Sequence, residues 1–285
     1  MAGGQASKTS GNVDWATVEG FGEEWASFDQ SELPKAEWHE LFERYFALFP
    51  WDSLPPDAEG FDLGCGSGRW AAGVAPLVGT LHCIDPSDKA LAVTRQRLAA
   101  SANARFHQAT SDTIPLPDAS QDFGYSLGVL HHVPDTAAAL RACAAKLKPG
   151  APFLVYLYYA FDNRPWWFRA IWIVSDALRK VISRLPFGPR KLVTGLIAAL
   201  AYWPLARLAL LLEQAGVRVE SVPLSPYRAS SFYTMRTDAL DRFGTRLEQR
   251  FTRAEIAAMM GAAGLEQVRF SDSVPYWVAV GYRAR

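Results

Sequence analysis

Short apolar runs alternate with amphipathic segments along much of this chain of 285 residues. The short apolar runs predict buried strands. One begins at Phe61, and the others span Thr80–Asp85, Ala104–Ala109, Asp122–Gly128 and Phe153–Tyr159. Segments typical of helices lie between them, at Arg69–Val78, Asp88–Ala100 and Asp135–Leu147. Strands that alternate with helices favour a mostly parallel sheet with right-handed crossovers.

Both ends of the chain depart from this alternation. A helix is predicted at Thr252–Ala263, and the strands Glu266–Phe270 and Trp277–Tyr282 follow with a linker short enough for antiparallel pairing. Near the other end, Lys35–Phe49 carries one apolar stripe at helical spacing. Before it, aromatic residues in a polar segment predict an arm or short helix that must pack on something: Trp15, Phe21, Trp25 and Phe28.

A glycine-rich turn follows the strand that enters at Phe61. Gly64, Gly66 and Gly68 come two residues after Asp62 and two apart. Glycine tolerates positive φ and lets the backbone approach a ligand closely. The helix predicted after the turn points its free N–H groups at the same place.

Two ligand classes fit such a turn. Gly66–Ala71 reads as the glycine fingerprint of a dinucleotide site, with Asp85 where a ribose-binding acid is expected. Counting the acid first gives D-x-G-x-G-x-G, starting at Asp62. A carboxylate there would repel a pyrophosphate, whereas it suits a ligand that carries ammonium and sulfonium charges.

In this second form, Asp62–Gly68 resembles motif I of the class I methyltransferases that use S-adenosylmethionine, of the methyltransferase type 11 kind. The resemblance covers about residues 61–160 and 251–285. It implies a Rossmann-like fold, mostly parallel with an antiparallel C-terminal hairpin, with S-adenosylmethionine as cofactor and S-adenosylhomocysteine as product. The predicted parts are a loose tail (1–13), an N-terminal helical lid (14–54), a methyltransferase domain (55–160 and 251–285) and a cap insertion (161–250).

The resemblance also implies which residues bind the cofactor. Asp85 is expected on the ribose hydroxyls, and the adenine contact stays open among Thr110, Ser111 and Asp112, because the usual acid is displaced here. The full set of expected cofactor residues is Asp62, Gly64, Cys65, Gly66, Gly68, Asp85, Pro86, Thr110, Ser111, Asp112, Leu127 and Gly128.

For the methyl acceptor the resemblance implies a small molecule, and we expect O-methylation of a hydrophobic, glycan-type or secondary-metabolite substrate. The alternatives are a peripheral-membrane lipid or quinone methyltransferase, a non-catalytic binding protein and an NAD-dependent enzyme. His131, then His132, is the expected general base, against a structural role for either histidine. Expected substrate residues are Trp25, Tyr227, Phe232, Tyr233, Arg236 and Asp238.

Composition narrows the possible partners. The formal net charge is zero, which gives no reason to expect nucleic acid. Three cysteines without a C-x-x-C pattern favour a reducing, cytoplasmic location. Five histidines show no metal-binding spacing, so no metal is expected. The first residues lack the apolar core of a signal peptide.

The insertion is unusually basic. Residues 163–212 contain eight Lys and Arg against Asp176 alone, a balance of +7, which leaves −7 elsewhere. The nearly apolar run Leu192–Ala206 is too short to span a membrane, and Pro204 and Arg207 should interrupt its continuation. The insertion is therefore expected to be a helical cap, buried against the rest of the chain or in a homodimer, or else a cationic, tryptophan-bearing surface on the inner face of a membrane.

Overall fold

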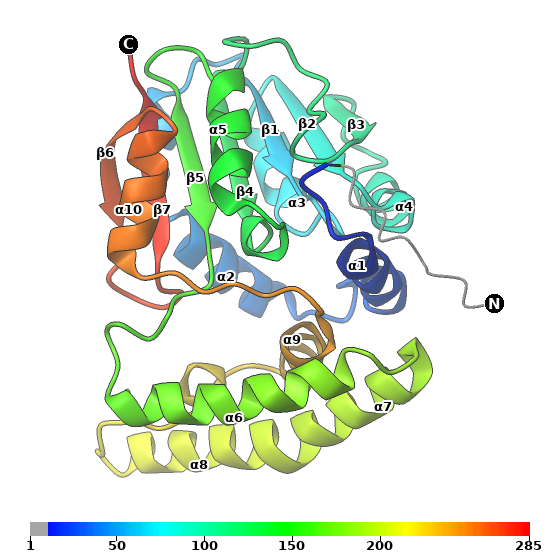
Figure 1. The fold of residues 1–285 in the computed structure, drawn as a ribbon, viewed down its shortest axis with the longest axis vertical. Coiled ribbons are helices and arrows are strands. Elements are labelled where there is room, and N and C mark those ends of the chain that lie inside the picture. Colours follow the sequence, from blue (N-terminus) through cyan, green and yellow to red (C-terminus); the bar gives the residue numbers. More distant parts are fainter. Residues whose placement is uncertain (1–10) are drawn as a thin grey trace, which may run out of the picture.

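The computed structural model describes residues 11–285, in which a sheet domain sits above a layer of helices (Figure 1). Seven strands pair in the order β3-β2-β1-β4-β5-β7-β6. The first five are parallel and β7 runs antiparallel to both of its neighbours. The strands are β1 (Glu59–Leu63), β2 (Thr80–Asp85), β3 (Ala104–Gln108), β4 (Phe123–Leu127), β5 (Pro152–Tyr156), β6 (Leu265–Phe270) and β7 (Val278–Arg283).

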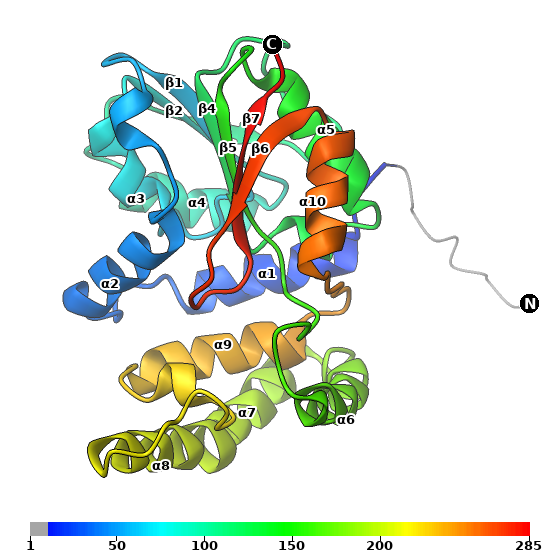
Figure 2. The same cartoon turned by 90° about the vertical axis from the view of Figure 1, so that its left-hand side faces the viewer.

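Helices cover both faces of the sheet because successive side chains of a strand point to opposite faces. On β5, Phe153 and Val155 pack in the cluster under α5 and α10, whereas Leu154 packs in the cluster under α2 and α3. Figure 2 shows these two helix layers on either side of the strands. The helices of this domain are α2 (Lys35–Phe46), α3 (Ala71–Val74), α4 (Asp88–Arg97), α5 (Thr136–Lys146) and α10 (Arg253–Ala262), with short 3₁₀ turns at Trp51–Ser53, Ala75–Leu77 and Leu130–His132.

The predicted strands and the terminal hairpin are confirmed, with ends that shift by a few residues. The helix expected at Arg69–Val78 is shorter and ends in a 3₁₀ turn. The aromatic arm is a regular helix, α1 (Trp15–Ser27), because Asp14 caps it by accepting from the backbone N–H of Thr17 at 2.7 Å.

The two N-terminal helices occupy different places. α1 lies beside α4 at the carboxyl ends of the strands, whereas α2 docks on α3, where Phe42 and Trp38 approach Gly73. The expected tail falls mostly on residues 1–10, outside the described residues. Asn12 and Val13, expected in that tail, instead line a cavity, and Val13 is buried.

Residues 161–250 form a helical layer of their own below the sheet domain. It contains α6 (Trp166–Ile182), α7 (Phe187–Ile197), α8 (Trp203–Gln214), α9 (Phe232–Gly244) and a 3₁₀ turn at Ser225–Tyr227. A small core that includes Ile182, Tyr202 and Phe243 holds these helices together. α9 lies between the other helices and α1, and the Arg190 guanidinium pairs with Glu23 of α1 at 2.9 Å.

One prediction for the insertion is wrong. α7, the π-helical turn η4 (Ala198–Tyr202) and α8 form one continuous helix of 28 residues, so Pro204 does not interrupt it. By length and composition alone this helix could cross a membrane. The cationic outer surface stays a prediction, but not every basic side chain of the insertion faces outward: Arg179 and Arg190 are buried against backbone carbonyls and acids, and Arg207 donates to the Arg228 and Ser230 carbonyls.

Candidate active site

The glycine turn after β1 is fixed by hydrogen bonds to β2. The N–H groups of Gly64 and Cys65 both donate to the Ile84 carbonyl, at 2.7 and 3.1 Å. Gly64 and Gly66 have φ of +80° and +56°, which side chains rarely adopt. A Cβ on Gly66 would lie 2.9 Å from the Trp25 indole nitrogen. The turn therefore needs glycine both for its shape and for the space above it.

Asp85, at the end of β2, holds this turn from the side. Its Oδ2 accepts from the Gly66 N–H at 2.9 Å, and its Oδ1 accepts from the Ser87 N–H at 2.8 Å. Burial raises the Asp85 pKa to about 6, although these two bonds favour the charged form. Each oxygen keeps a second lone pair, so the carboxylate can accept further hydrogen bonds from a ligand.

A cavity opens above the turn and is closed by α1 and the residues before it. Residues from four other segments line it: the turn, the end of β2, the end of β3, and the loop after β4. Nine of the expected cofactor residues lie on its wall, namely Gly64, Cys65, Gly66, Asp85, Pro86, Thr110, Ser111, Leu127 and Gly128. Trp25, expected to bind the acceptor, stands over Gly66 instead.

Three expected cofactor residues do not line the cavity. Gly68 packs on Thr94 within the turn. Asp112 accepts a hydrogen bond from the Asn12 backbone, so only Thr110 and Ser111 of the adenine candidates reach the wall. Asp62 lies beneath the wall, 2% exposed, with its Oδ2 unpaired.

Asp62 is unusual for a buried carboxyl group. Burial raises its pKa to about 8, the Tyr125 hydroxyl opposes this shift, and the Asp85 charge adds to it. An unpaired buried carboxylate oxygen needs a donor or a positive charge. A cationic ligand in the neighbouring cavity would supply that charge, and this fits an ammonium or sulfonium group better than a pyrophosphate.

The two adjacent histidines are placed differently. His132 lies on the cavity wall, where the Phe21 ring of α1 packs on it with centroids 5.0 Å apart. His131 is fully buried, stacks on Tyr158 at 3.8 Å, and has no hydrogen-bond partner at either nitrogen. Burial lowers its pKa far below the ordinary value. The structure therefore favours His132 over His131 as the residue that can meet a ligand.

The other expected acceptor residues lie in the helical layer, and none of them lines the cavity. Tyr233 accepts from the Gln30 N–H at 2.9 Å, and Arg236 stacks over Phe28, so both join α9 to the segment between α1 and α2. Phe232 packs edge-on against Trp203. Tyr227 and Asp238 interact with each other.

Asp238, an expected substrate residue, belongs to a charged cluster near His132 whose other members, Arg69, Glu24 and Asp241, were not predicted. Arg69 lines the cavity directly after the glycine turn, and its charge lowers the pKa of Glu24, Asp238 and Asp241. Burial raises the pKa of all three acids more strongly, to about 6 for Asp238. The spacing of Asp238 and Asp241, three residues apart on α9, was the available signal, because it places both on one helix face.

Asp241 connects this cluster to the histidines. Its Oδ1 lies 4.0 Å from His132 Nε2, and its Oδ2 accepts from the Tyr158 hydroxyl at 2.6 Å. Across residues 11–285, no group of three or more His, Cys, Asp or Glu side chains is placed to hold a metal ion.

Comparison with known proteins identifies the family of the sheet domain. Residues 61–155 match the family model described as a methyltransferase domain. The chain contains a class I S-adenosylmethionine-dependent methyltransferase domain. Its fold is similar to that of a solved S-adenosylmethionine-dependent methyltransferase from Aquifex aeolicus, at 13% identity and a TM-score of 0.50, over 90% of this chain and 96% of that one. This likeness concerns the fold alone.

Two curated relatives are similar to part of this chain. The ubiquinone biosynthesis O-methyltransferase of Thiobacillus denitrificans is 33% identical over 105 residues, 36% of this chain and 44% of that protein. The protein of the same name from Aromatoleum aromaticum is 30% identical over 129 residues, 45% of this chain and 53% of that protein. The aligned part thus spans about half the length of these relatives.

The raised pKa of Asp62 predicts how stability depends on pH. The folded chain holds this proton up to about pH 8, whereas the ordinary value is 3.8. The stability that the chain gains from protonated Asp62 is therefore fully present below the pKa of this group in the unfolded chain. It is lost as pH rises through the pKa of the group in the folded chain. Without ligand, the melting temperature of the wild type should fall more steeply between pH 5 and 9 than that of Asp62→Asn. Equal slopes would contradict the assignment.

Proposed function

We propose that this protein transfers the methyl group of S-adenosylmethionine to an oxygen atom of a small hydrophobic acceptor. The family supports the cofactor, and the two relatives, both ubiquinone biosynthesis O-methyltransferases, support O-methylation and a quinone-like substrate class. The observation that carries the proposal is the shared cavity, which has the glycine turn with Asp85 on one wall and His132 on another.

The residues of the cavity fit the cofactor. Asp85 can accept from the ribose hydroxyls with its remaining lone pairs, and Thr110 or Ser111 stands where the adenine is expected. Asp62 lies under the turn with a raised pKa, and a cationic ligand bound next to it would favour its charged form. When bound, the cofactor supplies a methyl group already activated by its sulfonium. The chain then has to align an acceptor with that methyl group and exclude water.

His132 has the geometry of a general base. Its Nδ1 lies 2.7 Å from the Leu247 carbonyl, which can only accept, so Nδ1 carries the proton and Nε2 presents a free lone pair. Nε2 is itself buried, has no hydrogen-bond partner and lies 4.0 Å from Asp241 Oδ1, so the acceptor hydroxyl must enter beside that carboxylate to reach it. Burial also lowers the His132 pKa, which favours the neutral ring. It can therefore take the acceptor hydroxyl proton as the oxygen bonds to the methyl carbon.

Asp241 supports this role as a positioning residue. Its charge raises the His132 pKa and would stabilise the imidazolium that forms when Nε2 takes a proton. The Tyr158 hydroxyl fixes the other carboxylate oxygen. Arg69, Glu24 and Asp238 lie close to Asp241, so the acceptor end of the site is polar and charged.

Replacing Asp85 by Asn tests the cofactor end. The change removes a charged acceptor, so the dissociation constant for S-adenosylmethionine should rise about 10- to 150-fold, the equivalent of about 1.5 to 3 kcal/mol. Calorimetry measures it, with Asp88→Asn as the matched control, since Asp88 is exposed on the next helix. Unchanged affinity in Asp85→Asn, or tight NAD binding by the wild type without a response to S-adenosylmethionine, would reject the proposal.

A side chain at Gly66 tests the turn itself. Gly66→Ala should abolish measurable cofactor binding, because its Cβ meets the Trp25 ring and the residue has positive φ. Gly195→Ala is the control, since a Cβ there meets nothing within 4 Å. Normal affinity in Gly66→Ala would place the ligand elsewhere.

The base is tested by turnover with a catechol that carries a short prenyl chain. His132→Asn should lower kcat by about 10²- to 10⁴-fold and leave cofactor affinity unchanged. His131→Asn should keep more activity, because His131 does not reach the cavity. Asp241→Asn should move the acidic limb of the kcat profile to lower pH, since the Asp241 charge raises the His132 pKa. Full activity in His132→Asn would discard this base.

A further inference from the structure

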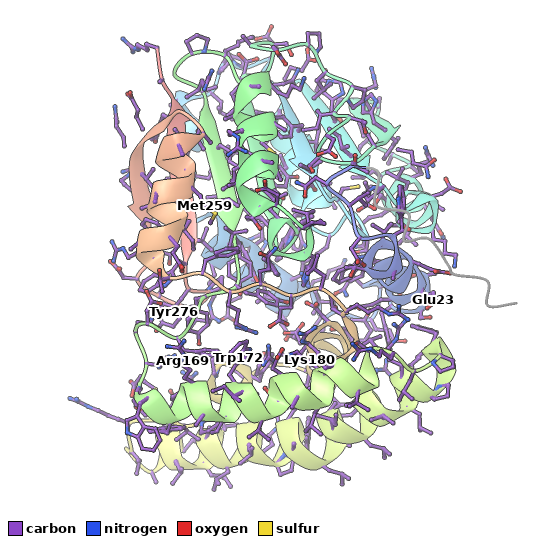
Figure 3. All side chains as sticks on the ribbon, in the orientation of Figure 1. Glu23, Arg169, Trp172, Lys180, Met259 and Tyr276 are labelled. Atoms are coloured by element: carbon purple, nitrogen blue, oxygen red, sulfur yellow. The ribbon has the colours of Figure 1, made fainter. Side chains whose placement is uncertain are left out.

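The helical layer exposes a large apolar surface on the side away from the sheet domain. Side chains project from the lower edge of this layer, beyond α6 and α8 (Figure 3). The exposed fraction reaches 82% for Trp166, 65% for Val174, 65% for Leu192 and 75% for Leu200. The exposed apolar side chains of α6 and of the helix Phe187–Gln214 form a surface that we call the outer face. It contains Trp166, Ile173, Val174, Leu192, Leu200 and Leu211.

The helix Phe187–Gln214 has its polar and apolar sides inverted relative to a helix in water. Its buried stripe contains Arg190, Thr194 and Tyr202, together with alanines at 198, 206 and 209. Arg190 and Thr194 satisfy their polar atoms inside the protein. The leucines point out. In a soluble monomer this arrangement would leave an apolar patch of a kind that normally marks an interaction site.

Basic side chains predominate among the exposed charges around the outer face. Between residues 166 and 211 the exposed ionic side chains are Arg169, Lys180 and Arg184. Asp176 is buried and pairs with Arg179 at 2.7 Å and with Lys180 at 2.9 Å, and the exposed Glu213 at the end of the long helix pairs with Arg228 at 2.7 Å. An apolar surface bordered mainly by basic groups complements an anionic lipid surface, where apolar side chains enter the interface and cations remain at the headgroups.

The contacts of the long helix decide its orientation. Its buried stripe packs on α9 and the helical layer from Arg190 to Ala209, and only 22% of its most apolar window is buried. A helix that packs on the protein from Arg190 to Ala209 cannot be surrounded by lipid on all sides, as an isolated spanning helix would be. It can lie in the interface over about 42 Å, at 1.5 Å per residue.

We propose that the outer face rests on an anionic lipid bilayer, with α6 and the helix Phe187–Gln214 in the plane of the interface. Attachment depends on apolar insertion and is strengthened by Arg169, Lys180 and Arg184. The sheet domain then stands away from the lipid on the opposite side of α9 (Figure 2). The proposal does not depend on methyl transfer, and cofactor binding can be measured separately.

Sedimentation of the full chain with vesicles tests the proposal. Binding should be strong to vesicles of phosphatidylglycerol and phosphatidylcholine, weaker to phosphatidylcholine alone, and reduced by high salt on the anionic vesicles. Val174→Glu with Leu200→Glu should lower the partition coefficient at least tenfold. Leu77→Glu is the matched control, because Leu77 is 55% exposed but lies in the sheet domain, and it should bind like the wild type.

Three results would overturn the proposal. The first is a wild-type chain that binds neither kind of vesicle. The second is a stable dimer in sedimentation velocity that Leu200→Glu dissociates while vesicle binding stays absent, which would make the outer face a self-association surface. The third is bound protein that alkaline carbonate does not release, which would favour a spanning helix. If the double variant fails to fold, Arg169→Glu with Arg184→Glu should still weaken binding to anionic vesicles alone.

Discussion

The hydrogen bonds that tie the glycine turn to the end of β2 are the constraint on which the site depends. Ile84 and Asp85 together hold the backbone N–H groups of Gly64, Cys65 and Gly66. Thr94 of α4 donates to the Gly66 carbonyl at 2.7 Å and fixes the other side of the turn. One carboxylate therefore shapes the turn and also presents its remaining lone pairs to the cavity. Fold and ligand site share the same atoms, and substitutions here affect both.

The sheet domain could be predicted because its signals are local. The turn has three glycines with positive φ, and the strands alternate their side chains. Ser87 and Asp135, which are residue types that favour N-caps, cap the next helices. The ribose candidate Asp85 follows from its position at a strand end. Asp62 was harder, since sequence places it beside the turn but cannot show that the carboxyl group lies beneath the cavity wall.

The helical layer was predicted less well because its structure depends on long-range contacts. Proline in the run after Leu192 suggested a break, but Pro204 lies inside the continuous helix, directly after the π-helical turn η4, where the backbone hydrogen-bond pattern already departs from that of an α-helix. From the sequence, the basic side chains of the insertion were expected on an outer surface. The structure turns several of those arginines inward to carbonyls and acids, as Arg179 does with the carbonyls of Thr245 and Arg246. No local pattern specifies those partners.

The inward arginines and the outward leucines have one physical explanation. Burying a guanidinium is costly unless carbonyls and carboxylates satisfy it, and here the segment from Thr245 to Arg246 and Glu23 of α1 provide them. These contacts connect the helical layer to the helix that closes the cavity. Leucines on the opposite side lose nothing if that side meets lipid instead of water. The same segment can thus be polar toward the active site and apolar toward a bilayer, which would place a hydrophobic acceptor and the methyl-transfer cavity on one molecule within reach of each other.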